Sequence, residues 1–271
     1  MGGHLMAQTN AHDIKELTRF ALDTVQRAGE AALRFYGKGQ RGLKFDQGLV
    51  TEAELALEDL FREELAKAFP DHQIFNNALL DEDYTHEEKR YVWVYDPLDG
   101  IANFQAGIPI WGVSIALLEN FWPLLGYFFM PATGDLFHAT ANEGAFYGRE
   151  KIQAPERDAI DDESLLLVFS RFHKHFHSSF PGKMLNLGCT SAHICYVANG
   201  RADAAIVANE SFQDLAAARV ILEGAGGKFY NMDGNEIFLN EYLEGQRIDG
   251  PLLVTTPALC KRIKRHLTER V

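Results

Sequence analysis

The stretch WVYDPLDGIANF at residues 93–104 decides the fold of this chain, because a β-rich run ends there in an acidic turn. Aromatic and β-branched residues predict a strand through Tyr95, and Pro97 forces the chain to turn. Asp96 and Asp99 then place two carboxylates at the end of that strand, where the ligand sites of α/β sheets collect. Two carboxylates this close repel each other unless a cation lies between them.

The residues after this turn predict a place for an anion. Gly100 frees the backbone, and we expect a helix to follow whose N–H groups, those of Gly100, Ile101 and Ala102, face the same spot. Such a helix end binds phosphate, and carboxylates beside it suit a magnesium–phosphate site. DPLDG alone is equally compatible with a plain surface turn, because Asp, Pro and Gly are all turn residues.

Composition and charge limit the classes of function. The 271 residues carry a formal net charge of −12, which argues against nucleic acid as a partner because no basic face can displace counterions. The same acidity disfavours a phosphate ester unless metal cations offset it locally. No apolar run approaches the ~20 residues of a membrane span, so no membrane partner is expected. The three scattered cysteines form no CxxC pair, which indicates reduced thiols and a cytoplasmic location.

Periodicity predicts the secondary structure of the first half. Apolar residues at helical spacing over residues 14–35 indicate a long helix. A second helix is expected after Thr51, with Thr51 and Glu54 as its capping box. β-Rich runs separated by turn residues follow over residues 91–147, and the polar residues 149–163 predict a linker.

In the second half, predicted strands alternate with predicted helices, which is typical of α/β structure. We therefore divide the chain into an α+β half at residues 7–150 and an α/β half at residues 151–271. The DPLDG turn belongs to the first half and the QDLAAA run at 213–218 to the second. We expect the site to lie between the halves and the halves to form one compact unit.

Two polar segments leave alternatives open. The acidic residues 76–90 are typical of a solvated loop. His173, His175 and His177 alternate, so on a strand they would share a face and could bind a transition metal. Their neighbours are Lys and Ser, and we favour a solvated loop or the rim of a binding cleft.

Four segments together resemble the inositol monophosphatase family. Residues 93–104 resemble its first signature, Trp-x-x-Asp-Pro-x-Asp-Gly-Thr-x-Asn-Phe, and residues 44–54 its Lys…Val-Thr-x-x-Asp segment. Residues 188–203 resemble its Gly-Thr-Ala…Val-Ala-x-Gly-x-x-Asp segment. Residues 213–227 resemble its second signature, Trp-Asp-x-Ala-x-x…Glu-Ala-Gly-Gly. These matches follow the family's order over roughly residues 14–265, nearly the whole chain.

The resemblance implies the family's layered αβαβα sandwich and a magnesium-dependent phosphatase, with manganese or calcium as alternative ions. Carried over by position, Asp96, Asp99 and Asp214 would bind metal, as would the backbone carbonyl of Leu98. Taken alone, Asp214 is better explained as the plain N-cap of a helix. The implied partner is a small phosphorylated polyol or sugar, such as an inositol phosphate, and the implied assembly is a homodimer.

Several positions depart from the family's pattern. Asn77 stands where the family has a Glu that binds metal and helps to position the attacking water. Ile101 replaces a Thr that helps to activate that water, and Glu54 replaces an Asp. Gln213 replaces a Trp, and Val207 aligns with a Glu that meets the substrate hydroxyls.

These departures predict a weakened site. Asparagine offers magnesium one neutral oxygen but accepts no proton, and losing a general base typically costs ~10²–10⁴ in rate. We therefore expect a phosphomonoesterase of low activity, unless Asp81, Glu82 or Asp83 replaces the missing Glu. The alternative is a non-catalytic binding or regulatory protein that keeps the fold and one metal site.

Overall fold

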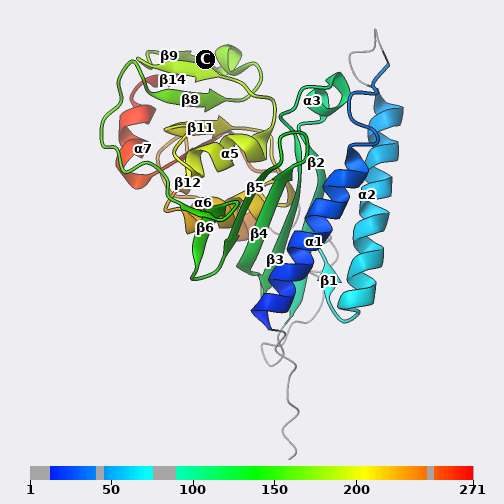
Figure 1. Ribbon diagram of the computed structural model, residues 1–271. Coiled ribbons are helices and arrows are strands. Elements are labelled where there is room, and N and C mark those ends of the chain that lie inside the picture. The colour runs from blue at the N-terminus through cyan, green and yellow to red at the C-terminus, as the bar shows by residue number, and fades with distance from the viewer. Residues whose placement is uncertain (1–12, 41–45, 76–89, 243–246, 271) are drawn as a thin grey trace, which may run out of the picture.

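The computed structural model describes residues 13–40, 46–75, 90–242 and 247–270. Its helices are α1 (Ile14–Ala32), α2 (Gln47–Ala68), α3 (Ile101–Ala106), α4 (Phe172–His175), α5 (Thr190–Ala198), α6 (Phe212–Gly224), α7 (Pro257–Lys264) and the 3₁₀ turn η2 (Leu239–Tyr242). Helices α1 and α2 pack on one face of a large sheet, and α6 packs on its other face. A second sheet and then α7 lie beyond α5 and α6 (Figure 1). The predicted αβαβα sandwich is confirmed.

Helix α1 forms because its apolar residues return on one face. Leu17, Ala21, Val25 and Ala28 are buried against the large sheet, at the spacing that a helix requires. The N-cap Asp13 accepts a hydrogen bond from the amide of Lys15. The helix ends at Ala32, three residues before the end of the predicted stripe.

Helix α2 begins earlier than its sequence predicted. Its N-cap is Asp46, whose Oδ1 accepts a hydrogen bond from the Leu49 amide at 3.2 Å. The capping box predicted at Thr51 and Glu54 is wrong, because the helix already begins at Gln47. Asp46 caps it by accepting a hydrogen bond from an amide of its first turn. Thr51 is an exposed residue within the helix.

The large sheet has seven strands in chain order. They are β1 (Gln73–Ile74), β2 (Tyr91–Asp99), β3 (Gly112–Glu119), β4 (Trp122–Met130), β5 (Asp135–Thr140), β6 (Gly144–Tyr147) and β7 (Glu150–Ile152). All neighbours are antiparallel except β1 and β2. Along β2, Trp93 and Tyr95 join the core under α1 and α2, while Val92 and Val94 join the core under α6. Helices cover both faces, which explains why β2 is apolar or aromatic from Tyr91 to Tyr95.

The second sheet has five strands in the order β10-β8-β11-β13-β12. They are β8 (Leu165–Val168), β10 (Lys183–Leu185), β11 (Ala204–Val207), β12 (Lys228–Asn231) and β13 (Leu252–Thr255). Strand β8 is parallel to both of its neighbours. Strand β13, the last of the five in the chain, is antiparallel to β11 and β12 and lies between them.

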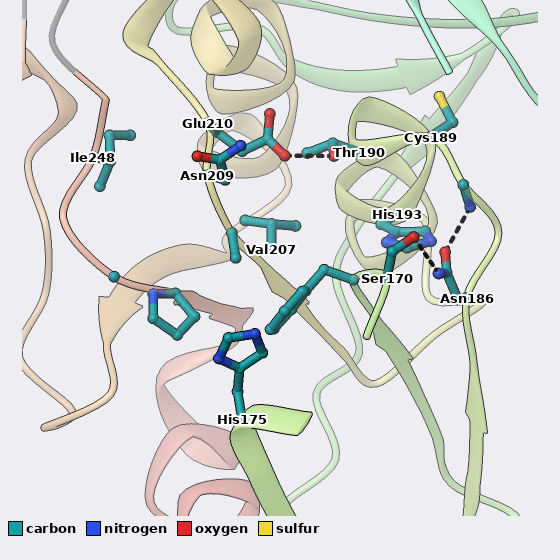
Figure 2. A pocket seen from close by; sticks show the side chains of 15 residues that line it. Ser170, His175, Asn186, Cys189, Thr190, His193, Val207, Asn209, Glu210 and Ile248 are labelled. Carbon is teal, nitrogen blue, oxygen red and sulfur yellow. Dashed lines mark hydrogen bonds between the residues drawn. The ribbon is translucent and has the colours of Figure 1, made fainter. Parts of the chain in front are cut away.

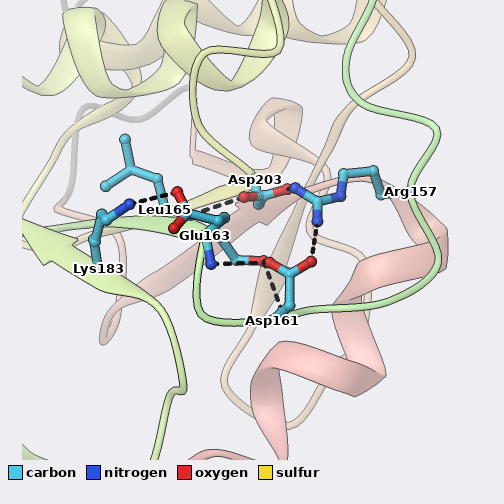
Figure 3. A network of polar contacts seen from close by, with 7 residues as sticks. Arg157, Asp161, Glu163, Leu165, Lys183 and Asp203 are labelled. Carbon is cyan, nitrogen blue, oxygen red and sulfur yellow. Dashed lines mark hydrogen bonds and ion pairs between the residues drawn. The ribbon is translucent and has the colours of Figure 1, made fainter.

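The polar residues predicted as a linker are partly ordered by an ion-pair network. Residues 150–152 form β7 and pair with β6, so the linker is shorter than predicted. Arg157 contacts Asp161 at 2.7 Å and Asp203 at 3.4 Å, and Asp203 accepts a hydrogen bond from the Leu165 amide at 2.8 Å (Figure 3). The network therefore fixes the start of β8. The division of the chain at residue 150 stays a prediction.

The alternating histidines do not share one strand. His173 and His175 belong to α4, and His177 belongs to β9 (Phe176–Ser178), which pairs with β14 (Leu267–Glu269). All three side chains are exposed. In the part of the chain that the structure describes, every helix is too short or too polar to cross a membrane.

Candidate active site between the two sheets

The end of β2 carries a bulge that brings two carboxylates together. Asp96 pairs with Ser114 and Asp99 pairs with Gly112, so β2 advances three residues where β3 advances two. Bulges of this kind re-aim side chains at sheet ends. The Leu98 amide, inside the bulge, donates a hydrogen bond of 3.2 Å to Asp96 Oδ1.

Gly100 is required by the turn that follows. Its φ is +87°, and a Cβ at this position would lie 2.9 Å from the Ile110 carbonyl oxygen and 3.1 Å from Cys189 Cβ. Helix α3 begins directly afterwards, at Ile101. The Ile101 side chain packs against the core under α1 and α2, while Ala102 is exposed.

Asp99 connects β2 to the beginning of α5. Its Oδ1 accepts a hydrogen bond from the Thr190 amide at 3.1 Å, and its Oδ2 accepts one from the Ser191 amide at 2.5 Å. Amides at a helix N-terminus favour a negative charge. The carboxylate therefore ties the large sheet to the helix that covers the second sheet.

Two amide side chains reinforce this connection. Asn103 Nδ2 lies 2.7 Å from the carbonyl oxygens of Ile110 and Leu187, which joins α3 to the segment before α5. Gln213 Nε2 donates to the Tyr95 carbonyl at 2.8 Å, which joins α6 to the end of β2.

The carboxylates between the sheets repel one another. Burial, followed by repulsion from Asp99 and Asp214, raises the pKa of Asp96 well above its usual range. Burial also raises the pKa of Asp99, against the lowering effect of the hydrogen bonds from Ser191 and Thr190. Among the described residues, the charges that act most strongly on Asp96 are those of other acids, Asp99, Asp214 and Glu210. A cation would favour the ionised form of each.

Asp214 lies in the first turn of α6 and has a capping role. Ser211 is the N-cap, and Asp214 Oδ2 accepts hydrogen bonds from the Ser211 amide at 2.7 Å and from its hydroxyl at 2.9 Å. The interpretation of Asp214 as the N-cap itself is wrong, because the helix begins at Phe212.

Glu210 is a further acid of this region that the sequence did not reveal. It lies between β11 and α6 and accepts a hydrogen bond of 2.8 Å from Thr190 Oγ1. Burial and then Asp99 raise its pKa to about 8. In the sequence, the only indication that Glu210 belongs to the site was its position after a strand and four residues before Asp214.

A cavity of about 620 Å³ opens beside Thr190 and Glu210 (Figure 2). Phe169, Ser170, His175, Asn186, Gly188, Cys189, Thr190, His193, Val207, Ala208, Asn209, Glu210, Ile248, Gly250 and Pro251 line it. His175 thus lies on the rim of a cleft, as one reading of the alternating histidines predicted. This volume suits a small molecule.

A family model extends over almost all of this architecture. The model described as the inositol monophosphatase family matches residues 13–267. The chain belongs to this family.

Individual relatives within the inositol monophosphatase family cover most of the chain. An inositol-1-monophosphatase from Mesorhizobium japonicum is 28% identical over 270 residues, which cover 94% of this chain and 98% of that protein. A histidinol-phosphatase from Chlorobaculum parvum is 29% identical and covers 82% of this chain and 88% of its own. The structure of an inositol monophosphatase from Zymomonas mobilis superimposes with a TM-score of 0.74, at 22% identity, covering 94% of this chain and 98% of that one.

Some of the positions that depart from the family's pattern lie outside the described residues. One of these is Asn77, and the three acids considered as substitutes for the missing Glu, Asp81, Glu82 and Asp83, lie outside the described residues as well. Glu54 is described: it lies in α2, and burial followed by Glu58 raises its pKa.

The family is one of metal-dependent phosphatases, and the acids between the sheets fit a cation in part. Asp96 and Asp99 have the charge that a divalent ion would compensate. Among the residues that the structure describes, however, no three His, Cys, Asp or Glu side chains are arranged as a metal-binding group. The described side chains thus supply part of a ligand set.

Proposed function

We propose that the protein is a magnesium-dependent phosphomonoesterase of low activity that acts on a small phosphorylated polyol or sugar. The observation that carries the proposal is the meeting of Asp96 and Asp99 at the bulge of β2, where burial and mutual repulsion raise the pKa of Asp96. The relatives named above, an inositol-1-monophosphatase and a histidinol-phosphatase, support a small phosphomonoester as substrate.

The residues take distinct roles in this proposal. Asp96, Asp99, Asp214 and the Leu98 carbonyl would hold magnesium, which would supply a Lewis acid and an activated water. The backbone of Gly100, Ile101 and Ala102 would hold the phosphate, because α3 begins there with amides that have no partner within the helix. The cavity beside Glu210 would receive the alcohol portion of the substrate.

The low activity follows from two replaced side chains. Ile101 has no hydroxyl to orient a water, and its side chain is committed to the core under α1 and α2. Asn77 accepts no proton. We further propose a homodimer, with manganese or calcium as alternative ions, and a cytoplasmic location, which the three free cysteines favour.

The second candidate is a non-catalytic binding or regulatory protein on the same fold. The packing of Ile101 against the core favours it, because that position no longer serves a water. Such a protein would bind the same phosphomonoesters through the backbone at Gly100 and the cavity, without releasing phosphate.

Phosphate release separates the two candidates. The wild type is assayed against a panel of inositol, sugar and amino-alcohol phosphates, with magnesium or manganese and with EDTA, beside Asp96→Asn. If the protein is an enzyme, we expect slow phosphate release that is abolished by EDTA and by Asp96→Asn. Release that persists in EDTA would refute the metal-dependent mechanism, and calorimetric binding without any release would favour the second candidate.

A further inference from the structure

The cavity contains one side-chain acid among its lining residues, Glu210. His193, another lining residue, accepts a hydrogen bond at Nε2 from the Leu187 amide, and burial lowers its pKa to about 4, so it is neutral. His175 is exposed at the rim. The acidic group that lines this cavity is therefore the carboxyl group of Glu210.

The carboxyl group of Glu210 is held in place from two sides. The Ile248 amide donates to the Glu210 carbonyl at 2.8 Å, which fixes its backbone, and Thr190 Oγ1 donates to Oε1 at 2.8 Å. Thr190 also donates its amide to Asp99, so it lies between the two acids. No described residue donates a hydrogen bond to the other oxygen of Glu210, Oε2. Figure 2 shows the carboxyl group beside Thr190 at the edge of the cavity.

The protein compensates this charge poorly. Burial, Asp99 and Asp214 all raise the pKa of Glu210. The Arg247 guanidinium lowers that pKa less than any of these groups raises it, and it donates a hydrogen bond to the Asn209 carbonyl. Glu210 is partly buried, and a cation that enters the cavity would stabilise its carboxylate form.

The remaining walls suit a carbon skeleton. Phe169, Val207, Ile248 and Pro251 contribute apolar side chains to the cavity. Val207 offers no acceptor to a substrate hydroxyl, whereas Glu210, three residues later, offers a carboxyl group that a cation would hold in its ionised form. The lining is thus less suited to a fully hydroxylated ring than to an alkyl or aromatic body with one cationic group.

We propose that Glu210 selects phosphomonoesters whose alcohol carries an ammonium group, by pairing with that group inside the cavity. Glu210 is a specificity residue in this scheme: it holds the end of the substrate away from the phosphate. The proposal narrows the substrate class and rests on the proposed function, because it takes the phosphate to lie at the end of β2.

The test uses pairs of ligands that differ only in the charged end. A series of ω-aminoalkyl phosphates is compared with alkyl phosphates in which a methyl group replaces the ammonium, by calorimetric titration with magnesium present. The wild type, Glu210→Gln and Glu210→Asp are measured. Glu150→Gln is the matched control, because Glu150 is an exposed acid on β7 and the substitution makes the same change in net charge.

For at least one chain length we expect the wild type and Glu150→Gln to prefer the ammonium ligand by roughly tenfold or more, as a charge-assisted hydrogen bond predicts. Glu210→Gln should reduce the preference to below twofold without lowering the affinity for the alkyl ligand. Glu210→Asp should retain part of the preference for the ammonium ligand. Equal affinity for both ligands in the wild type, or a preference that survives in Glu210→Gln, overturns the proposal. An ammonium preference without phosphate release would refute the proposed enzyme and leave the role of Glu210 standing.

Discussion

His193 should make the folded protein sensitive to acid. It lies in α5 with 3% of its surface exposed, and its Nε2 accepts the Leu187 amide at 2.9 Å. Burial lowers its pKa from 6.5 to about 4. Between pH 6.5 and pH 4, His193 is therefore protonated in the unfolded chain but remains neutral in the folded protein. Above pH 6.5 His193 does not reduce the free energy of unfolding, and its destabilising effect grows as the pH falls from 6.5 toward 4.

The size of the effect follows from the two pKa values. At pH 5 the unfolded histidine is almost fully protonated and the folded one is mostly neutral, so the free energy of unfolding should fall by about 2 kcal/mol relative to pH 7.5. Other groups titrate over the same range. His193→Gln removes this titration while it keeps an acceptor for the Leu187 amide, so the difference between wild type and variant isolates it.

Urea unfolding at pH 7.5 and pH 5.0, without metal, provides the measurement. The wild type should lose about 2 kcal/mol more than His193→Gln over this range. His173→Gln is the control, because it removes an exposed histidine, and it should follow the wild type. An equal pH-dependent loss in the wild type and in His193→Gln would refute the reasoning.

Three further outcomes are expected. Calorimetric titration with magnesium should show one dominant site and a weak second one, with the dominant site lost in Asp99→Asn; two comparably tight sites would mean that another acid replaces the missing Glu. Gly100→Ala should lower the free energy of unfolding in urea by about 1–3 kcal/mol, because the position has a positive φ and no room for a Cβ; an unchanged midpoint would contradict this. Asn77→Glu and Ile101→Thr together should raise phosphate release by more than the two single changes combined, because both serve one water. Robust wild-type release that the double variant lowers would show that the site activates water in another way.

The sequence predicted the parts of the fold whose determinants are local. The apolar stripe of α1 and the β-rich run before Asp96 are local patterns, so both elements were found, although α1 ends three residues earlier and β2 continues to Asp99. The start of α2 was misplaced because two capping signals, at Asp46 and Thr51, compete within a few residues. Only the structure shows that the earlier one is used.

The site was less predictable because it depends on contacts distant in sequence. The pairing of Asp99 with the amides of α5 joins residues more than 90 positions apart. Glu210 belongs to no sequence motif, and its hydrogen bond with Thr190 joins the loop before α6 to the first residue of α5. The roles of Asp96, Leu98, Asp99 and Asp214 as metal ligands stay predictions.

The place of β13 has a consequence for how the protein is made. The strands of the seven-stranded sheet all lie within residues 73–152, so this sheet can close while the ribosome is still adding the second half. The other sheet cannot, because residues 252–255 fill the gap between β11 and β12. Until they emerge, the nascent chain exposes two unpaired strand edges, which are templates for aggregation. A premature stop shortly before Leu252 should therefore yield insoluble protein, although more than nine-tenths of the residues would have been translated.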